Sequence, residues 1–550
     1  MRIDRPRGFV PRSKGCNLPP DYAVCAENLN QSTGRFEPWR SPVPLISFKE
    51  PVRVAHLSHC CWTGTDLCGA KYVDAGLDTK TYLSAPERRP LVTDDICCPD
   101  WCFLGYPVPD PIQLYPDPES TVDKGPDAQS RTYRITYGTD CEEGPASCPS
   151  EALVVDKNSR VGLLLPSPPD QAWCATHVNI YRSESLWDPS TGLYSTQISD
   201  LEGGYTSTST DQDYFLVAQV PISTRAWIDQ STECEGKLLT TADLLPPREG
   251  SQVAGETQSG SLVIWNDRTL WFSERNKYWG FPLKTAHDFP EPIRNVLVCL
   301  DLVYVLTCSE VYLLSDEVDC RESTIRVPRL VKDAPGVSDD TCVSELSSGV
   351  LYSSDAGLVH VRPDRSYRLV SDPAFGRDDW HSLGPIRAVT ITNQNVILST
   401  DQREYVWVLS LDENGYLPPD LTTLSFRVDQ WIVGANDNRL YFLVNNEVYE
   451  FNIGADYMDM DWWQAEQVSS QRDRISAVKA DYVKKNGQNK NKISVYRDGN
   501  LSVDKILTDK GGRIRASASR CNQIRVRGNE PMCSVSYGQG LNNVDRGDQQ

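Results

Sequence analysis

Five segments between residues 251 and 453 decide the fold class, because each ends a run rich in β-branched and aromatic residues. They read Leu270-Trp-Phe-Ser, Val311-Tyr-Leu-Leu-Ser, Leu358-Val-His-Val, Tyr405-Val-Trp-Val-Leu and Val448-Tyr-Glu-Phe-Asn. Counted from Trp271, equivalent positions recur after 41, 47, 47 and 43 residues. A four-stranded propeller blade takes about 40 to 50 residues and buries its faces only against neighbouring blades. The repeat therefore predicts five visible β-propeller blades and leaves the total blade number open.

The composition agrees with an all-β protein of several domains. The chain has 550 residues, with 35 Gly and 37 Pro against only four Met, and Val, Thr, Tyr and Trp are frequent. Such residues favour pleated sheets and tight turns over helices. The longest apolar stretch, Val296 to Cys308, is too short to span a bilayer. The basic amino terminus leads into no apolar core, so we expect no secretory signal and synthesis in the cytosol.

Composition shifts along the chain predict its organisation. The Pro-rich stretch at 107–130 opposes regular ladders and indicates a domain boundary. Within the first segment, Tyr22 to Asn30 is expected to form a short helical turn. The ring of blades could be closed by Leu45-Ile-Ser-Phe or by Ile493-Ser-Val-Tyr, which precedes a hairpin-like Asp498-Gly499 turn. The predicted parts are an extended N-terminal arm at 1–50, a Cys-rich β segment with a Pro-rich linker at 51–125, a fibronectin-like β-sandwich at 126–235, propeller blades at 250–465, a basic C-terminal β segment that closes the fold at 466–540, and a frayed tail at 541–550.

Charge is distributed unevenly. The net charge is −20, but residues 471–550 hold 16 Lys and Arg against 8 Asp and Glu. An acidic body discourages broad nucleic-acid binding, which depends on cations that displace counterions. Four lysines of one basic loop are candidates for contact with DNA phosphate, although a solvated hairpin tip is the favoured interpretation: Lys484, Lys485, Lys490 and Lys492.

Twelve of the 18 cysteines lie before residue 235, which allows three interpretations. Such a density of cysteines is typical of a disulfide scaffold or of a zinc site. Zinc is disfavoured, because no CxxC pair exists and adjacent cysteines do not easily share one tetrahedral zinc ion. Buried thiols in a reducing compartment, able to oxidise after release, are the favoured interpretation. No metal or other cofactor is predicted.

Two sequence features raise the question of catalysis. Asp456, Asp459 and Asp461 precede two Trp residues, as acid and base carboxylates do in some glycosidases, although a solvated acidic loop is the simpler interpretation. Ser353 to Gly357 matches half of a sialidase Asp-box and is interpreted as a hairpin turn. Motifs of serine hydrolases and zinc peptidases are missing from the sequence. We therefore predict a protein that is not an enzyme.

Three ordered motifs carry a resemblance to a known family. The first is Pro, Leu-Pro, Ala…Asn-Leu and Gly-x-x-x-Pro; the second is a Tyr-rich strand followed by Glu-Glu-Gly-Pro-x-Ser; the third runs from Leu270-Trp-Phe-Ser-Glu to Tyr352-Ser-Ser-Asp-Ala-Gly-Leu-Val. Over about residues 9–375 the chain resembles the nozzle, or tail hub, proteins of short-tailed bacteriophages, also called tail tubular protein B or phage stabilisation protein. The motif positions taken as assembly candidates are Leu18, Pro19, Asn28, Gly34, Pro38, Trp39, Gly144 and Pro145.

The resemblance implies a structural protein of the virion tail that is assembled in the host cytoplasm. Its partners would be five further copies in a hexameric ring, a tail adaptor ring above it, fibres or spikes outside, and viral DNA passing transiently through the channel. The alternative is a propeller tail protein that binds or hydrolyses bacterial glycan, suggested by the acidic, Trp-rich cluster and the half Asp-box.

Overall fold

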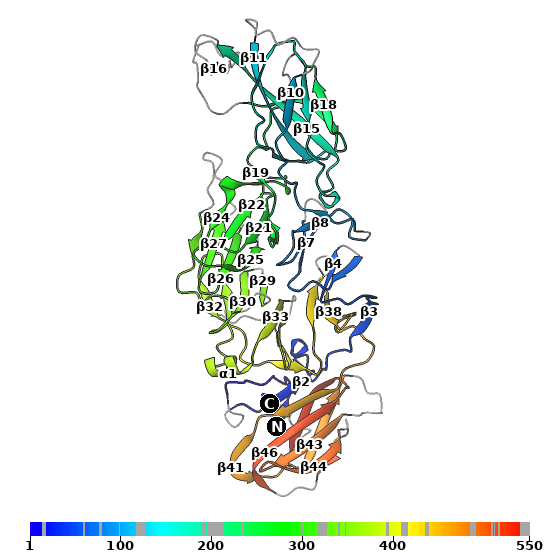
Figure 1. Ribbon diagram of the computed structural model, residues 1–550. Coiled ribbons are helices and arrows are strands. Elements are labelled where there is room, and N and C mark those ends of the chain that lie inside the picture. The colour runs from blue at the N-terminus through cyan, green and yellow to red at the C-terminus, as the bar shows by residue number, and fades with distance from the viewer. Residues whose placement is uncertain are drawn as a thin grey trace. The chain divides into compact units, whose positions relative to one another are not determined.

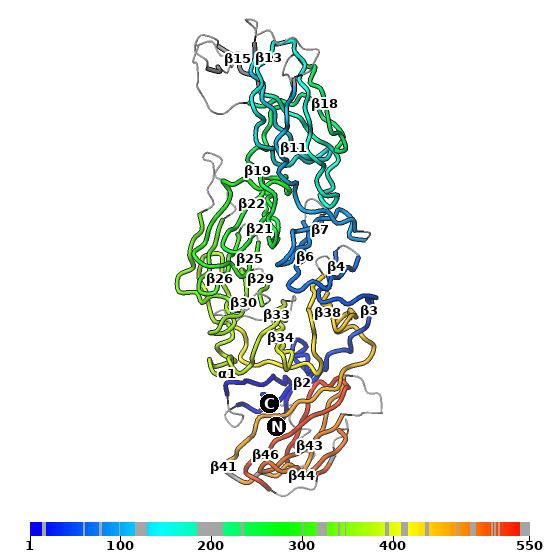
Figure 2. Tube along the Cα trace, in the orientation of Figure 1, coloured from blue at the N-terminus to red at the C-terminus, as the bar shows by residue number. Residues whose placement is uncertain are grey.

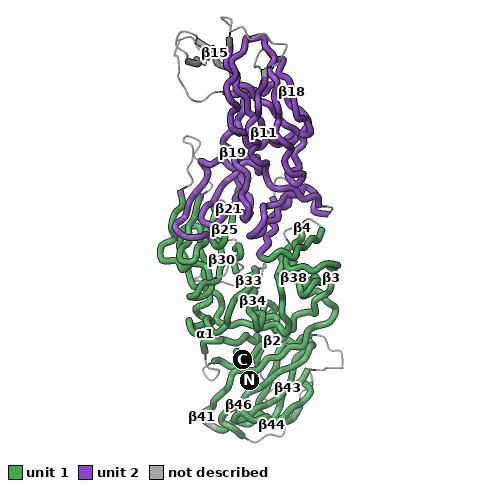
Figure 3. The backbone as a smooth tube through the Cα atoms, viewed as in Figure 1, with its two compact units in different colours: residues 1–68, 294–314, 328–550 green, residues 69–293, 315–327 purple. Residues whose placement is uncertain are grey.

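Figure 1 shows the computed structural model of the chain, in which nearly all regular structure is β. Within the described residues the only α-helix is α1 (Arg377–Ser382), and no helix there is long and apolar enough to cross a membrane. The chain divides into two compact units, unit 1 at 1–68, 294–314 and 328–550, and unit 2 at 69–293 and 315–327 (Figure 3). The structure describes residues 1–539 except 14–17, 59–60, 76–79, 98, 117–127, 189–192, 196–212, 233–235, 300–301, 316–326, 339–341, 347, 392–394, 409–415, 435–438, 484–490, 508–509, 511 and 515–517.

Unit 1 contains antiparallel sheets built from consecutive strands, as in propeller blades. A two-stranded sheet of β4 (Val54–Ser58) and β5 (Cys61–Thr65) accompanies them. The blade sheets are β25 (Ile293–Cys299), β26 (Leu302–Thr307), β27 (Val311–Ser315) and β28 (Arg329–Leu330); β29 (Val343–Leu346), β30 (Gly349–Ser354), β31 (Gly357–Val361) and β32 (Tyr367–Leu369); β33 (Ile386–Ile391), β34 (Asn395–Thr400), β35 (Glu404–Val408) and β36 (Thr422–Leu424); and β37 (Gln430–Val433), β38 (Leu440–Val444), β39 (Glu447–Glu450) and β3 (Val43–Ser47).

These blade sheets pack against one another in chain order. Tyr304 of β26 and Tyr352 of β30 share one buried cluster, and the next cluster joins Leu351 to Trp407 of β35. Two further clusters continue the series to β37–β39 and then to β4 and β5. Each fully buried large apolar side chain contributes about 1.5–3 kcal/mol. Face-to-face packing of successive four-stranded sheets is the β-propeller arrangement.

The five segments singled out in the sequence are confirmed as strands, and each is the third strand of its blade. Four of these blades are separate four-stranded sheets, whereas β33–β36 form one end of a ten-stranded sheet. The five segments correspond to β27, β31, β35 and β39 of unit 1 and to β22 (Thr269–Phe272) of unit 2. β31 is paired on both edges, and its sheet shares one buried cluster with the preceding blade and another with the following blade. In β31 all five residues are accordingly buried. This double burial explains why the pattern there is almost continuously apolar.

The strand that completes the last repeat comes from the amino-terminal part of the chain. β3 pairs with β39, with Val43 opposite Glu450, so the first of the two suggested strands joins the last blade sheet. The second is wrong, because β43 (Lys492–Arg497) pairs with β44 (Asn500–Ile506) and β46 (Ser519–Gly528) instead. The predicted tight turn between β43 and β44 is present, with Asp498 and Gly499 both at positive φ.

The C-terminal strands form a β-sandwich together with the start of the chain. Figure 2 shows the blue N-terminal trace beside the orange and red strands. Ile3, Phe36, Trp462 and Val526 are among the buried residues between the sheets. The sheets contain β1 (Arg2–Ile3), β47 (Met532–Gly538), β42 (Ala477–Tyr482) and β45 (Gly512–Arg513), and β2 (Ala23–Glu27), β40 (Met460–Gln464), β41 (Gln467–Asp473), β46, β43 and β44. The basic C-terminal segment thus lies in this sandwich, and the expected frayed tail falls outside the described residues.

The short helical turn expected at Tyr22 to Asn30 is wrong. β2 occupies this segment, with Ala26 opposite Trp462 of β40, and also pairs in parallel with Thr423 of β36. The backbone of this segment pairs with a strand on each side, which stabilises it more than the hydrogen bonds of an isolated helical turn would. The helical residues follow later, in the 3-10 turn η2 (Gln31–Thr33).

Unit 2 holds two more blade sheets, which pack on each other, and a β-sandwich with its own core. The segment predicted as Cys-rich β structure contains one of these blades. The Pro-rich stretch contains an edge strand, β10, that ends at Pro116. The blade sheets are β6 (Lys71–Asp74), β7 (Thr81–Ser84), β8 (Leu91–Thr93) and β9 (Cys102–Phe103), and β20 (Gln252–Glu256), β21 (Leu262–Asn266), β22 and β24 (His287–Asp288). The sandwich sheets are β12 (Glu143–Ala146), β11 (Ala128–Gly138), β15 (His177–Asp188), β16 (Leu193–Ser195), β13 (Leu153–Asp156) and β17 (Phe215–Pro221), and β10 (Gln113–Pro116), β14 (Val161–Leu164) and β18 (Ala226–Asp229).

Candidate functional site

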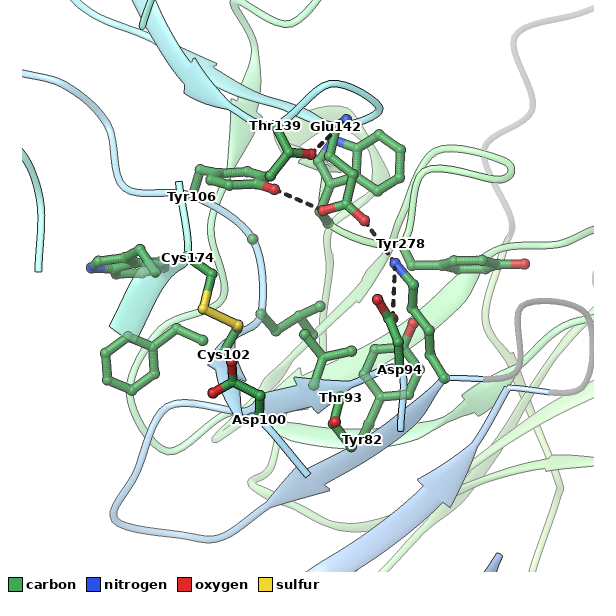
Figure 4. A pocket seen from close by; sticks show the side chains of 17 residues that line it. Tyr82, Thr93, Asp94, Asp100, Cys102, Tyr106, Thr139, Glu142, Cys174 and Tyr278 are labelled. Carbon is green, nitrogen blue, oxygen red and sulfur yellow. Dashed lines mark hydrogen bonds and ion pairs between the residues drawn. A yellow bond between two sulfur atoms is a disulfide. The ribbon is translucent and has the colours of Figure 1, made fainter. Parts of the chain in front are cut away.

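A small cavity of about 180 Å3 lies in unit 2, where the sheet β6–β9 meets the sandwich (Figure 4). Lys80 and Asp94 line it from the sheet, and Thr139 and Glu142 line it from the turn between β11 and β12. Tyr106 lies on the segment that leads from β9 into the sandwich. Polar groups from both parts therefore face one another across this cavity.

Glu142 is the centre of the polar contacts. Its Oε1 lies 2.7 Å from Lys80 Nζ, and its Oε2 accepts a hydrogen bond of 2.9 Å from the Tyr106 hydroxyl. The Glu142 amide donates to Thr139 Oγ1 at 3.2 Å, which fixes the turn. Burial, followed by the negative charge of Glu142, raises the pKa of Tyr106 well above its usual value. Tyr106 therefore stays protonated and acts as a hydrogen-bond donor.

A disulfide closes the opposite side of the cavity. Cys102 of β9 is bonded to Cys174, which follows the 3-10 turn η3 (Gln171–Trp173), and the pair is separated by 72 residues. Phe103 and Trp173 pack edge to face beside it, with ring centroids 5.1 Å apart. Trp279 adds a hydrogen bond of 3.0 Å from its indole N–H to the Glu143 carbonyl. We name the disulfide, the Lys80–Glu142 ion pair and the Trp279–Glu143 hydrogen bond together the sandwich joint.

Some of the cysteines form disulfides, which the interpretation of thiols able to oxidise after release allows. Cys61 and Cys97 are disulfide-bonded as well as Cys102 and Cys174. Nine described cysteines are free thiols, of which four are exposed. Among the residues that the structure describes, no group of three or more His, Cys, Asp or Glu side chains could hold a metal ion.

The motif residues Gly144 and Pro145 are buried next to the cavity. A Cβ atom on Gly144 would lie 2.4 Å from the Cβ of Tyr106, so only glycine lets the turn approach the segment that carries this tyrosine. The sequence identified these two positions but gave no sign of Lys80, Tyr106 or Trp279. Cysteine density was the only signal near Cys102, and it did not specify a partner.

The N-terminal motif residues lie where the arm meets the blades. Asn28 has φ 57°, a left-handed conformation that Asn tolerates, and its amide donates to the Thr423 carbonyl at 2.7 Å. Its side chain donates to the Asp459 carbonyl at 2.8 Å and accepts from the Ser425 amide. Trp39 is 3% exposed and packs on Phe451. These contacts hold the arm within the chain's own fold.

The remaining motif residues shape the path of the arm. Gly34 has φ 62° and ends the turn η2, and Pro38 forms an isolated bridge with Leu29. The Leu18 carbonyl accepts a hydrogen bond from Gln467, and the Pro19 carbonyl accepts one from the Tyr22 amide. The motif therefore directs the arm toward the C-terminal strands.

Trp462 holds the arm from the opposite side. It is fully buried, packs edge to face on Phe36 with centroids 5.1 Å apart, and donates from its indole N–H to the Arg7 carbonyl at 2.9 Å. The contacts made by Asn28, Trp39 and Trp462 together are named the arm joint.

The acidic, Trp-rich cluster is used in structural contacts. Arg525 binds the Asp461 carboxylate with two nitrogens and lies 5.2 Å from the ring centroid of Trp463. The carbonyls of Asp456 and Asp459 accept hydrogen bonds from the Ser41 amide and the Asn28 side chain. The half Asp-box forms the tight turn between β30 and β31, as predicted.

Of the four lysines proposed to face DNA, Lys484, Lys485 and Lys490 lie outside the described residues. Lys492 is exposed at the start of β43, opposite Ile506 of β44 and Arg527 of β46. The structure therefore places one of the four, at an end of the C-terminal sandwich.

Comparisons with known proteins are distant. No protein-family model matches the chain, and no curated protein sequence matches it. Among solved structures, the chain is similar to BamB from Moraxella catarrhalis (9% identity, TM-score 0.32, 79% of this chain and 98% of that chain covered) and to the RRP9 WD40 repeats (8%, 0.30, 71% and 96%). Kluyvelomyces marxianus Hsv2 is a third (10%, 0.26, 51% and 69%). The β-propeller assignment rests on the chain's own sheets.

Proposed function

We propose that this chain is a structural subunit of the tail nozzle, or hub, of a short-tailed bacteriophage. Six copies would form a ring below the tail adaptor, with fibres or spikes attached outside and DNA passing through the channel during ejection. The chain would be assembled in the host cytoplasm and would end in the virion tail. No catalytic step and no cofactor are part of the proposal.

One observation carries the proposal: residues of the first two resemblance motifs lie where the parts of the chain are joined. Asn28 and Trp39 fasten the arm to the blades, and Gly144 lets the sandwich turn pack against Tyr106. Motif residues located at joints are expected of a building block whose parts must keep a fixed geometry. An enzyme motif would be expected to converge on a reaction centre instead.

The charge balance supports a conduit. Six copies of a −20 chain carry about −120 formal charges, and an acidic wall repels phosphate, so DNA would not be retained. The excess of Lys and Arg in residues 471–550 would give the C-terminal part a different role, either toward DNA or toward an acidic neighbour.

The oligomeric state tests the proposal directly. Purified full-length chain is examined by mass photometry and negative-stain microscopy, alone and after mixing with the adaptor protein of the same virion. A species of six times 61.6 kDa with six-fold rings is expected. Persistent monomers in both conditions would contradict it. If those monomers shortened host polysaccharide, the glycan-hydrolysing alternative would replace it, and the matched variant Asp461→Asn would show whether the acidic cluster is responsible.

A further inference from the structure

A second cavity in unit 2 has the features of a binding groove. It encloses about 300 Å3 between the segment 245–251, Trp271 of β22 and the 3-10 turn η4 (Leu283–Thr285). Leu245 and Leu283 stand at its edge and are 38% and 64% exposed. Large apolar side chains that gather in one hollow of a surface mark an interaction site more often than single exposed ones do.

Arg248 gives this groove a charge. Its side chain is exposed, and its guanidinium lies 5.9 Å from the Trp271 ring centroid. It forms no ion pair with a carboxylate of the residues that the structure describes. Arg89 is occupied, because it donates to the Pro247 carbonyl at 2.9 Å and lies over the Trp173 ring. Glu249 is the single carboxylate among the lining residues.

The size and lining of the groove limit its occupant. Its volume is at the lower end of the roughly 300–1,000 Å3 of small-molecule pockets, which suits one or two side chains. Apolar residues dominate the lining, and a sugar chain would leave many hydroxyls without partners against them. An unpaired guanidinium over an aromatic face favours a carboxylate close to the apolar group.

We propose that this groove binds an extended peptide segment of a partner protein in which an aromatic or aliphatic side chain lies next to Asp or Glu. The apolar side chain packs on Trp271 between Leu245 and Leu283, and the carboxylate pairs with Arg248. This inference goes beyond the proposed tail function and does not depend on ring formation.

Fluorescence anisotropy of the full-length chain tests the proposal. The probe is a capped, fluorescein-labelled peptide of alternating Phe and Asp, compared with peptides in which Lys replaces Asp or Ser replaces Phe. Only the first is expected to bind, and raising NaCl should weaken it. Arg248→Glu and Leu283→Ser should each lower its affinity about tenfold. The matched exposed positions of unit 2, Arg275→Glu and Leu164→Ser, should leave the affinity within about twofold.

Three results would overturn the inference. The first is that the Phe-Asp peptide does not bind at millimolar concentration, and the second is that Arg248→Glu binds it as well as the unaltered chain does. The third is that an oligosaccharide of acidic sugars binds with the same dependence on Arg248 and Leu283 while the peptide does not, which would make the occupant a glycan. Circular dichroism of each variant confirms that the fold is kept. None of these results bears on the six-fold ring.

Discussion

The arm joint fastens the N-terminal arm to the blades and to the C-terminal sandwich, whereas the sandwich joint fastens the sandwich of unit 2 to the sheet β6–β9. The two joints use different chemistry. The arm joint is made of buried aromatic rings and of hydrogen bonds from side chains to main-chain groups. Cys25 beside it is a free thiol whose pKa is raised by burial and then by the charge of Asp461. The sandwich joint is made of a disulfide, an ion pair and one indole hydrogen bond. The arm joint should therefore be insensitive to redox conditions and salt, whereas the sandwich joint should respond to both.

The largest effect is expected at the arm joint. Trp462→Ala would leave a cavity in the C-terminal core and remove the indole hydrogen bond to the Arg7 carbonyl, at a cost of about 3–5 kcal/mol in the free energy of unfolding. Urea unfolding of the purified chain measures this loss. The neighbouring Trp463 is partly exposed and serves as the matched control, because Trp463→Ala should cost clearly less. Equal losses would show that the arm is not held by the Trp462 side of β40.

Removal of the disulfide should rank second. Replacing both Cys102 and Cys174 by Ser opens a loop whose ends are 72 residues apart. This change should lower the free energy of unfolding by roughly 2–4 kcal/mol. Thermal unfolding and limited proteolysis between β9 and η3 would detect the change. A dithiol reductant should shift the unaltered chain in the same direction and affect the double variant less. A reductant effect of equal size in both proteins would place the redox sensitivity at other disulfides, such as those of Cys61 and Cys97.

The sequence predicts the blades better than the joints, for a physical reason. A strand such as β31 is buried on both faces, so its composition alone identifies it. β2 is different, because its conformation is set by partners more than 390 residues away, Thr423 and Trp462, and local propensity there indicated a helical turn. The spacing of the cysteines likewise does not predict that Cys102 pairs with Cys174. Motif positions such as Gly144 could be found, but the tyrosine that requires the glycine could not.

The ion pair of the sandwich joint should give the smallest effect and the sharpest test of its chemistry. Glu142→Gln keeps the shape of the side chain but removes the charge that faces Lys80. The side chains of Lys80 and Glu142 are only 18% and 22% exposed, so the free energy of unfolding is expected to fall by about 1–2 kcal/mol. Asp94→Asn is the matched control, because the Asp94 side chain is 80% exposed and its carboxylate lies 3.8 Å from the same Lys80 ammonium group. This substitution should leave the free energy of unfolding almost unchanged. Thermal unfolding at low and high NaCl distinguishes the two, since salt should narrow the gap between the unaltered chain and Glu142→Gln. Loss of the same size in both variants would mean that the charge of Lys80 alone, and not its short contact with Glu142, stabilises the joint.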